Sequence, residues 1–320
     1  MRAFRLTATG TPPGLHQIDR PAPGKGEVLV RIAACGLNFA DTLMVKGTYQ
    51  DIPPLPATLG LELAGTVEAL GPGVTAPAPG TRVAISAGHG GLAEYGVFPA
   101  ALCVPLPDAM SFETAAGFQI AYGTSHLALT RAGRLQPGET LVVTGAAGGV
   151  GLTAVEIGAQ MGARVIAVAR GAEKLALARA AGAEVTLEAE GTDLRAAVKD
   201  LGGADVVYET VGGPGFEGLL RALRPEGRML AIGFAGGEVP LVKPNHLLVK
   251  NISVIGFYWA GYRSFAPDVL RASMAELFDW YAEGRLKPHV GAVLPLERAA
   301  EGLELLISRR ATGKVVVTMG

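Results

Sequence analysis

Four glycines within one short turn are the first residues of this sequence whose type and spacing suggest chemistry: Gly145, Gly148, Gly149 and Gly151. Residues 141–144, just before the turn, form a β-branched apolar run that is typical of a buried strand. A helical pattern then runs over about 150–161. A helix that begins after such a turn presents free backbone N–H groups and the positive end of its dipole to an anion. Glycine is needed there because a β-carbon would hold a pyrophosphate away from the backbone.

The pattern around the turn decides how it is interpreted. Its spacing is Gly-x-x-Gly-x-x-Gly rather than Gly-x-Gly-x-x-Gly, so the turn alone is weakly diagnostic and a plain crossover turn stays open. A second strand over 163–170 completes a βαβ unit of about the usual length. The complete unit therefore predicts a dinucleotide site.

Cations at the end of the second strand favour NADPH over NADH. An NAD site usually places Asp or Glu about 20 residues beyond the glycines, where the carboxylate binds the ribose 2′-hydroxyl. Here Arg170 holds that position and Lys174 lies one turn into the next helix, which suits a 2′-phosphate. Glu173 lies between them and could serve NAD instead, and an ordinary solvated helix start is the third interpretation.

The elements that must position these residues are of two kinds. Residues 1–120 contain short alternating strands, such as 27–33 and 65–70, between Pro and Gly turns, which predicts a compact all-β fold. From 141 to about 256 strands alternate with helices, which predicts a doubly wound parallel sheet that binds ligands at the carboxyl ends of its strands. The elements beyond residue 256 are too few for a domain of their own, and we expect them to pack on the first 120 residues.

Composition argues against several classes of partner. The 320 residues carry a net charge of −1 without a block of like charge, so nothing indicates a nucleic acid or an anionic membrane surface. The apolar runs have the length of strands and the N-terminus lacks a signal-peptide pattern, so we expect a cytoplasmic protein with no membrane span. Cys35 and Cys103 lie in apolar surroundings, which is typical of buried thiols.

Several motifs that follow one another along the chain resemble a known family. They are residues 35–73, the glycine turn AAGGVG, DVVYETVG at 205–212, GRMLAIG at 227–233 and ATGKVVV at 311–317. Over essentially the whole chain they resemble the zinc-free quinone oxidoreductase branch of the medium-chain dehydrogenase/reductase superfamily, which includes the ζ-crystallins. The resemblance implies an α/β protein in which a GroES-like β-barrel catalytic domain (1–120 plus 257–320) is split by an inserted Rossmann domain (121–256). It also implies NADPH and a homodimer joined through the edges of the nucleotide-binding sheets.

The residues themselves predict that no metal takes part. In the zinc-dependent relatives, C-x-[ST]-D and G-H-E motifs supply the catalytic ligands. This chain has Asn38 and Asp41 at the first motif, and Gly60, Leu61 and Glu62 at the second. Asn is a poor zinc ligand and Leu is none, two cysteines cannot form a four-cysteine site, and the five histidines lack metal spacing.

Three residues of the expected catalytic domain are catalytic candidates by the resemblance: Asn38, Asp41 and Tyr49. Asn38 corresponds to a residue that faces the nicotinamide ribose, and Asp41 to one that fixes the same loop. Tyr49 corresponds to a tyrosine that related enoyl reductases use as a proton donor or carbonyl partner, which suits a phenol that is protonated at neutral pH. Asn38 as a turn cap and Tyr49 as a loop aromatic packed on prolines remain open.

The expected cofactor contacts come from both domains: Asn38, Thr124, Gly148, Gly149, Val150, Arg170, Lys174, Gly233, Phe234, Phe257 and Lys314. The turn residues would bind the pyrophosphate, Thr124 a phosphate or the carboxamide, and Gly233 with Phe234 would lie beside the nicotinamide. Phe257 begins three adjacent aromatics that could line the substrate pocket or belong to the core or a dimer interface. Lys314 could reach the nicotinamide half or simply start the last strand.

One departure from the family pattern concerns the 2′-phosphate. Some quinone reductases add a tyrosine after the third Rossmann strand, where the nearest matches here are Leu187 and Ala189, and a C-terminal arginine, which could be Arg309 or Arg310. The phosphate site is therefore expected to have fewer cofactor contacts than in those relatives.

The residues and the resemblance together predict an oxidoreductase that uses NADPH to reduce a quinone without a metal. Reduction of an activated C=C bond, in an enoyl thioester, alkenal or enone, needs nearly the same residues and is the alternative. A crystallin-like or RNA-binding role is the remote alternative. The intact glycine turn argues for an active cofactor site, and the lack of a basic stretch argues against RNA.

Overall fold

The computed structural model describes residues 1–320, which form two compact units. Unit 1 consists of Met1–Ile120 and Pro288–Gly320, and unit 2 is the inserted segment Ala121–Lys287. Unit 1 is rich in antiparallel strands and unit 2 contains one parallel sheet, as the change of pattern along the sequence predicts. No helix combines the length and the apolar character that a bilayer crossing needs.

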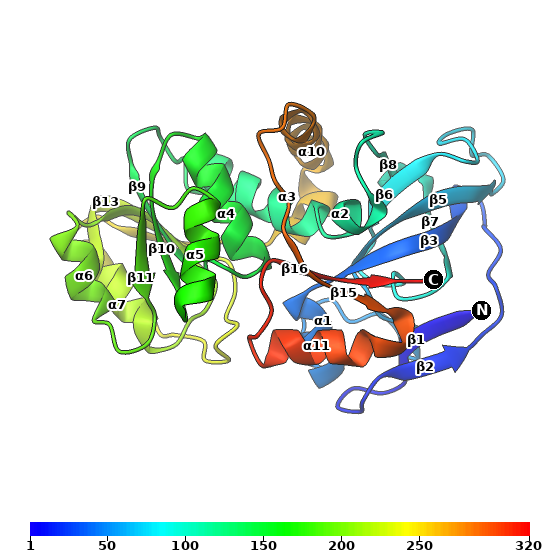
Figure 1. Ribbon diagram of the computed structural model, residues 1–320, viewed down its shortest axis with the longest axis horizontal. Coiled ribbons are helices and arrows are strands. Elements are labelled where there is room, and N and C mark those ends of the chain that lie inside the picture. The colour runs from blue at the N-terminus through cyan, green and yellow to red at the C-terminus, as the bar shows by residue number, and fades with distance from the viewer. The chain divides into compact units, whose positions relative to one another are not determined.

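Unit 1 is built on two sheets (Figure 1). Its strands are β1 (Arg2–Leu6), β2 (Gly14–Gln17), β3 (Glu27–Leu37), β4 (Ala57–Thr58), β5 (Glu62–Leu70), β6 (Arg82–Ser86), β7 (Tyr95–Pro99), β8 (Val104–Pro105), β15 (Val290–Pro295) and β16 (Lys314–Thr318). Its helices are α1 (Phe39–Lys46), α2 (Phe112–Ala116) and α11 (Ala299–Ile307). The large sheet has the order β15-β16-β3-β5-β6-β8, with β7 also on β3, and the small sheet has the order β2-β1-β4.

Strand β3 organises unit 1 because it pairs with β5, β7 and β16. Eight of its eleven residues are buried, and five of these share one hydrophobic core with residues of β1, β5, β6 and the C-terminal elements. Val315 on β16 pairs with Leu37 at the end of β3, so the last strand of the chain lies beside the first residues of the predicted catalytic loop. The C-terminal segment therefore completes the first sheet, as expected.

Unit 2 has a six-stranded parallel sheet of order β11-β10-β9-β12-β13-β14. Its strands are β9 (Thr140–Thr144), β10 (Arg164–Ala169), β11 (Val185–Glu188), β12 (Ala204–Glu209), β13 (Leu223–Ala231) and β14 (Ser253–Gly256). Its helices are α3 (Gln119–Leu127, whose first two residues belong to unit 1), α4 (Gly149–Gln160), α5 (Ala172–Ala180), α6 (Leu194–Asp200), α7 (Pro214–Ala222), α8 (Pro244–Leu248), α9 (Tyr262–Phe265) and α10 (Pro267–Ala282). The sheet lies between α4 and α5 on one face and α6 and α7 on the other (Figure 1). This is the doubly wound arrangement that the alternation predicts.

The boundary between the units differs from the expectation. Residues 257–287 were expected to return to unit 1, but they belong to unit 2, and the return begins at Pro288. Glu156 on α4 explains the later boundary, because its carboxylate accepts a 2.6 Å hydrogen bond from the backbone N–H of Lys287 and another from the Tyr122 hydroxyl. Gln160, one turn further along α4, donates to the carbonyl of Arg285. These side chains hold the segment after α10 on the parallel sheet's own helices.

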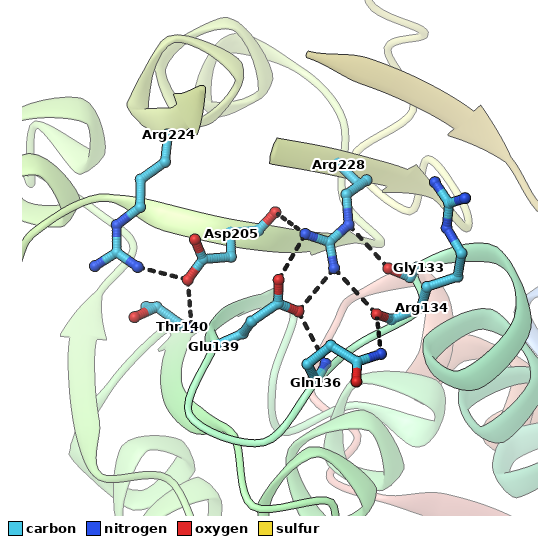
Figure 2. Close-up of polar contacts among 8 residues, drawn as sticks. All are labelled: Gly133, Arg134, Gln136, Glu139, Thr140, Asp205, Arg224 and Arg228. Carbon is cyan, nitrogen blue, oxygen red and sulfur yellow. Dashed lines mark hydrogen bonds and ion pairs between the residues drawn. The ribbon is translucent and has the colours of Figure 1, made fainter. Parts of the chain in front are cut away.

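The amino ends of three neighbouring strands are joined by a polar network (Figure 2). The Arg228 guanidinium on β13 donates to both Glu139 oxygens, at 2.8 and 2.7 Å, and to the carbonyl of Gly133. Asp205 at the start of β12 accepts from the backbone N–H of Thr140 and from Arg224. Arg228 holds the pKa of Glu139 below its usual range. The strands are thus fixed at the end opposite to the glycine turn.

Candidate cofactor and catalytic sites

The glycine turn links β9 to α4 at the carboxyl end of the parallel sheet. Gly145 has φ +57°, and Gly148, the N-cap of α4, donates its N–H to the Gly145 carbonyl at 2.9 Å. A β-carbon on Gly151 would lie 2.1 Å from the Gly145 carbonyl oxygen, and one on Gly145 would lie 2.5 Å from Thr210 Oγ1. Both positions therefore require glycine.

The start of α4 has the properties of an anion site. The N–H groups of Gly149, Val150 and Gly151 belong to the first helical turn, where no acceptor exists within the helix. They combine with the helix dipole and with a loop that lacks β-carbons at Gly148 and Gly149. These residues fit the pyrophosphate of a dinucleotide, and Gly148, Gly149 and Val150 would hold it.

Beneath the turn, a buried carboxylate connects two strand ends. Glu209, at the end of β12, accepts hydrogen bonds from Thr144 Oγ1 and from the N–H groups of Val211 and Gly212, at 2.7–2.9 Å. Thr210 donates its N–H to Thr144 Oγ1 and its hydroxyl to the Thr144 carbonyl. Burial raises the pKa of Glu209, and these hydrogen bonds act against that rise. The motif at 205–212 contains Glu209, but the sequence pattern gave it no role, because its partner Thr144 lies on another strand.

The same carboxyl edge gathers the other expected cofactor residues of unit 2. Ser125, directly after Thr124 on α3, donates to the carbonyl of Val150, so Thr124 lies beside the first turn of α4. Phe234 follows β13, and its ring lies 3.1 Å from where a β-carbon on Gly212 would be. The topology therefore brings the predicted residues from α3, α4 and β13 to one edge.

Two of the three aromatics after β14 make contacts within unit 2. The Trp259 indole is buried against α3, where a β-carbon on Gly123 would lie 2.5 Å from its Nε1. The Phe257 ring contacts the Tyr262 ring at a centroid distance of 5.6 Å. Trp259 therefore belongs to the core, which is one of the roles that the sequence left open.

The predicted ribose site holds acidic groups as well as cations. Arg170 directly follows β10, Gly171 comes next with φ +79°, and Lys174 lies in the first turn of α5. Burial first, and the Arg170 charge second, lower the pKa of Lys174. The Gly171 N–H donates to the Glu188 carboxylate at 2.8 Å, and Arg170 forms a 3.6 Å ion pair with Glu190. The sequence pattern pointed to the neighbours of Glu188, namely Leu187 and Ala189, but not to the two acids.

In unit 1, Asn38 and Asp41 are joined at the start of α1. Asn38 is the N-cap, and its backbone N–H donates to Asp41 Oδ2 at 2.8 Å. Asp41 Oδ1 accepts from the N–H of Gly60 at 3.1 Å. Burial raises the pKa of Asp41 to about 7, although both N–H groups and Lys314 oppose the rise. Asp41 therefore fixes the loop that carries Asn38.

The side chain of Asn38 belongs to a buried cluster with Glu62 and Lys314. Lys314 Nζ donates at 2.8 Å to the Leu37 carbonyl, to Asn38 Oδ1 and to Glu62 Oε1. Asn38 Nδ2 donates to the same Glu62 oxygen at 3.1 Å, and the other oxygen accepts from the Ile120 N–H. The three donors of Lys314 are thus directed at unit 1 acceptors, and the ammonium orients the Asn38 amide.

The donor set around this cluster does not suit zinc. Leu61 is buried and offers no ligand atom, and burial raises the pKa of the Cys35 thiol well above its usual range. No group of three or more His, Cys, Asp and Glu side chains is arranged to hold a metal ion.

The third catalytic candidate is Tyr49 in unit 1. It belongs to the loop after α1 and packs against the hydrophobic core of unit 1. This packing agrees with the loop-aromatic interpretation, and proton donation by the hydroxyl stays a prediction.

Two family models and several known proteins are similar to this chain. A family model described as "Alcohol dehydrogenase GroES-like domain" matches residues 24–108, and one described as "Zinc-binding dehydrogenase" matches residues 149–279. The Mus musculus protein named quinone oxidoreductase-like protein 2 is 37% identical over 322 residues, which span 99% of this chain and 92% of that protein.

Solved structures agree with this chain over its full length. The quinone oxidoreductase from Thermus thermophilus, described with its NADPH complex, has 35% identity and a TM-score of 0.88, with 100% of both chains covered. The Escherichia coli quinone oxidoreductase complexed with NADPH has 30% identity and a TM-score of 0.93, also with 100% of both chains covered. The fold class predicted from the sequence, a GroES-like unit with a Rossmann-type parallel sheet, is therefore confirmed.

Proposed function

Because this chain belongs to the quinone oxidoreductase branch of the medium-chain dehydrogenase/reductase superfamily, we propose that it is a metal-independent NADPH:quinone oxidoreductase. The observation that carries the proposal is the glycine turn at the start of α4, where free N–H groups of the first helical turn can bind a pyrophosphate and a β-carbon on Gly151 would collide with the Gly145 carbonyl. Arg170 and Lys174, directly after β10 and in α5, support the phosphorylated form of the cofactor.

The reduction of a quinone to a hydroquinone requires a hydride and one proton. Bound NADPH supplies the hydride. The chain's residues then have to bind and orient the cofactor and the quinone, and to protonate the quinone oxygen. In this proposal Asn38, whose amide is fixed by Lys314 and Glu62, orients the nicotinamide ribose, and Tyr49 donates the proton to the quinone oxygen from its hydroxyl.

Metal independence is supported by the contacts of the polar cluster. Glu62, the acid of the motif that carries a zinc ligand in zinc-dependent relatives, is paired with the Lys314 ammonium at 2.8 Å. The cluster therefore already balances its buried carboxylate with an internal cation. Dialysis against a chelator should leave turnover unchanged, and restoration by added zinc of an activity lost on chelation would contradict the proposal.

The experiment that tests the function follows NADPH oxidation by absorbance, with a naphthoquinone and separately with a crotonyl thioester or an alkenal. We expect fast turnover with the quinone and slow turnover with the alkenes. Fast turnover with an alkene and slow turnover with the quinone would assign the protein to C=C reduction instead. Oxidation with neither class would refute both activities.

The preference for NADPH over NADH is tested by changing Arg170 and Lys174. The double change Arg170→Asp with Lys174→Ala removes the positive charges proposed to face the 2′-phosphate. NADPH should bind more weakly by one to two orders of magnitude, about 1.4 kcal/mol for each tenfold, while NADH binding changes little. Equal weakening of both nucleotides would mean that these residues shape the loop and do not recognise the phosphate.

We further propose that the protein is a homodimer joined along β14. This strand pairs only with β13, and four large apolar side chains on the segment that precedes it are exposed, between 66% and 92%: Val239, Leu241, Leu248 and Val249. An open edge beside exposed apolar side chains suits a second copy that continues the sheet. Light scattering after gel filtration should give a dimer mass, and Leu241→Glu with Leu248→Glu should shift it to the monomer.

A further inference from the structure

We propose that Glu188 and Glu190 set the cofactor preference of this protein by competing with the 2′-phosphate for the groups that would recognise it. The proposal rests on the proposed NADPH function and concerns the same ribose site. It assigns a specificity role to two acids beside the cations, and it predicts a weaker preference for NADPH over NADH than Arg170 and Lys174 alone would give.

Glu188 accepts a hydrogen bond from a backbone N–H that lies just after β10. Strands β10 and β11 run parallel with Ala169 opposite Glu188, so this side chain reaches across the strand ends to Gly171. Its Oε2 accepts the Gly171 N–H at 2.8 Å, and its Oε1 accepts the Glu190 N–H at 3.3 Å. Gly171 is the N-cap of α5, so its N–H lies at the positive end of a helix. The carboxylate thus sits where an anion at this loop would be stabilised.

Glu190 pairs with Arg170, the other group that would recognise the 2′-phosphate. Its Oε1 lies 3.6 Å from Arg170 Nη1, with the Arg170 side chain 38% exposed and the Glu190 side chain 76% exposed. An ion pair this open to water is weak, and its partners can separate. Glu190 therefore partly neutralises Arg170 without blocking it permanently.

The charge balance decides the effect on each nucleotide. A 2′-phosphate carries about −1.5 to −2 charges and three acceptor oxygens, so it gains from Arg170 and Lys174 but is repelled by both carboxylates. A bare 2′-hydroxyl carries no charge and meets no such repulsion. Glu188 and Glu190 should consequently weaken NADPH and leave NADH nearly unaffected, and added salt should reduce the difference.

The test uses the full-length protein and two nucleotide fragments, 2′,5′-ADP and 5′-ADP, with affinities measured by isothermal titration calorimetry. The variants are Glu188→Gln, Glu190→Gln and the double change. At position 188 glutamine keeps one amide oxygen for the Gly171 N–H, so the substitution removes the charge and gives up only the longer, 3.3 Å hydrogen bond from the Glu190 N–H. Glu184→Gln is the matched control, because Glu184 pairs with Arg164 at 2.8 Å at the opposite ends of the same two strands.

We expect each single change to tighten 2′,5′-ADP by about threefold and the double change by about tenfold, with 5′-ADP unchanged. The control Glu184→Gln should change neither ligand. Equal tightening of both fragments, or no tightening in any variant while the wild type binds 2′,5′-ADP, would overturn this proposal. A wild type that binds neither 2′,5′-ADP nor NADPH would instead refute the proposed function, so the two failures are distinguishable.

Discussion

Lys314, on the last strand of unit 1, holds Glu62, on β5, in an ion pair of 2.8 Å that is almost wholly buried. Burying two charges costs several kcal/mol, and the cost is offset only where their remaining hydrogen-bond groups are satisfied. Here the Leu37 carbonyl, the Asn38 amide and the Ile120 N–H complete those bonds. The pair therefore fixes the orientation of Asn38 in a site that lacks a metal-ligand set.

Lys314→Met should destabilise the protein by about 3–5 kcal/mol, because it leaves the Glu62 carboxylate buried without its counter-charge. Adding Glu62→Gln should recover most of the loss, while turnover stays low since Asn38 has lost the ammonium that orients it. Urea unfolding and NADPH oxidation measure the two effects. Equal losses of stability in the single and double variants would mean that lost packing, and not the unpaired Glu62 charge, causes the destabilisation. Arg298→Met, at the exposed pair with Glu301, is the control and should leave the free energy of unfolding nearly unchanged.

Asp41→Asn should remove a pH dependence of stability. Burial raises the pKa of Asp41 from 3.8 to about 7, so the folded chain keeps this proton to higher pH than the unfolded chain does. The contribution of the protonated Asp41 carboxyl to the free energy of unfolding is complete below about pH 4 and is lost as the pH rises through about 7. The free energy of unfolding of wild type minus that of the variant should therefore be larger near pH 5 than near pH 8.

Urea unfolding at both pH values measures this difference. Asp108→Asn, at an exposed carboxylate of the same unit, is the matched control for the exchange of Asp for Asn. A wild-type-minus-Asp41→Asn difference that is independent of pH would show that Asp41 is ionised throughout the range.

Gly148→Ala and Gly151→Ala should separate cofactor binding from folding. A β-carbon on Gly151 would meet the Gly145 carbonyl at 2.1 Å, so this alanine should cost about 2 kcal/mol or more in stability. Gly148 has φ −84°, which alanine adopts, and its β-carbon would lie 3.3 Å from the same oxygen. Gly148→Ala should fold with a change below about 1 kcal/mol and yet lose NADPH affinity. Undiminished NADPH affinity in Gly148→Ala would place the pyrophosphate elsewhere.

Tyr49→Phe should lower kcat by about 100-fold and leave the NADPH affinity unchanged if its hydroxyl gives the proton to the quinone. Tyr95→Phe is the matched control, because the Tyr95 ring in the same unit is covered by the Arg20 guanidinium at 4.1 Å. Stopped-flow turnover and an NADPH titration separate the two parameters. An unchanged kcat would leave Tyr49 a packing residue of the loop after α1.

Local pattern was sufficient for the parallel sheet and for its glycine turn. The strand expected over 163–170 contains β10, and the helix expected over about 150–161 agrees with α4 to within one residue at each end. An alternation of strands and helices is compatible with only a few arrangements of a parallel sheet. Gly-rich turns can be recognised without knowing which residues pack around them. The element types were therefore predictable from the sequence.

Long-range pairing was not predictable in the same way. The partners Glu62 and Lys314 are separated by 252 positions, and no spacing rule connects them. The expected domain boundary at residue 256 is too early because Glu156 and Gln160 on α4 decide where Arg285 and Lys287 lie. A side chain that crosses between elements leaves no periodic signal in the sequence.

The network of Arg228, Glu139 and Asp205 has a consequence for how relatives of this protein diverge. It sets the relative alignment of β9, β12 and β13 at the end of the sheet opposite to the glycine turn (Figure 2). The loops at the other end can then be exchanged during evolution without disturbing that alignment. A new substrate range is therefore accessible through loop mutations that leave the scaffold's folding intact.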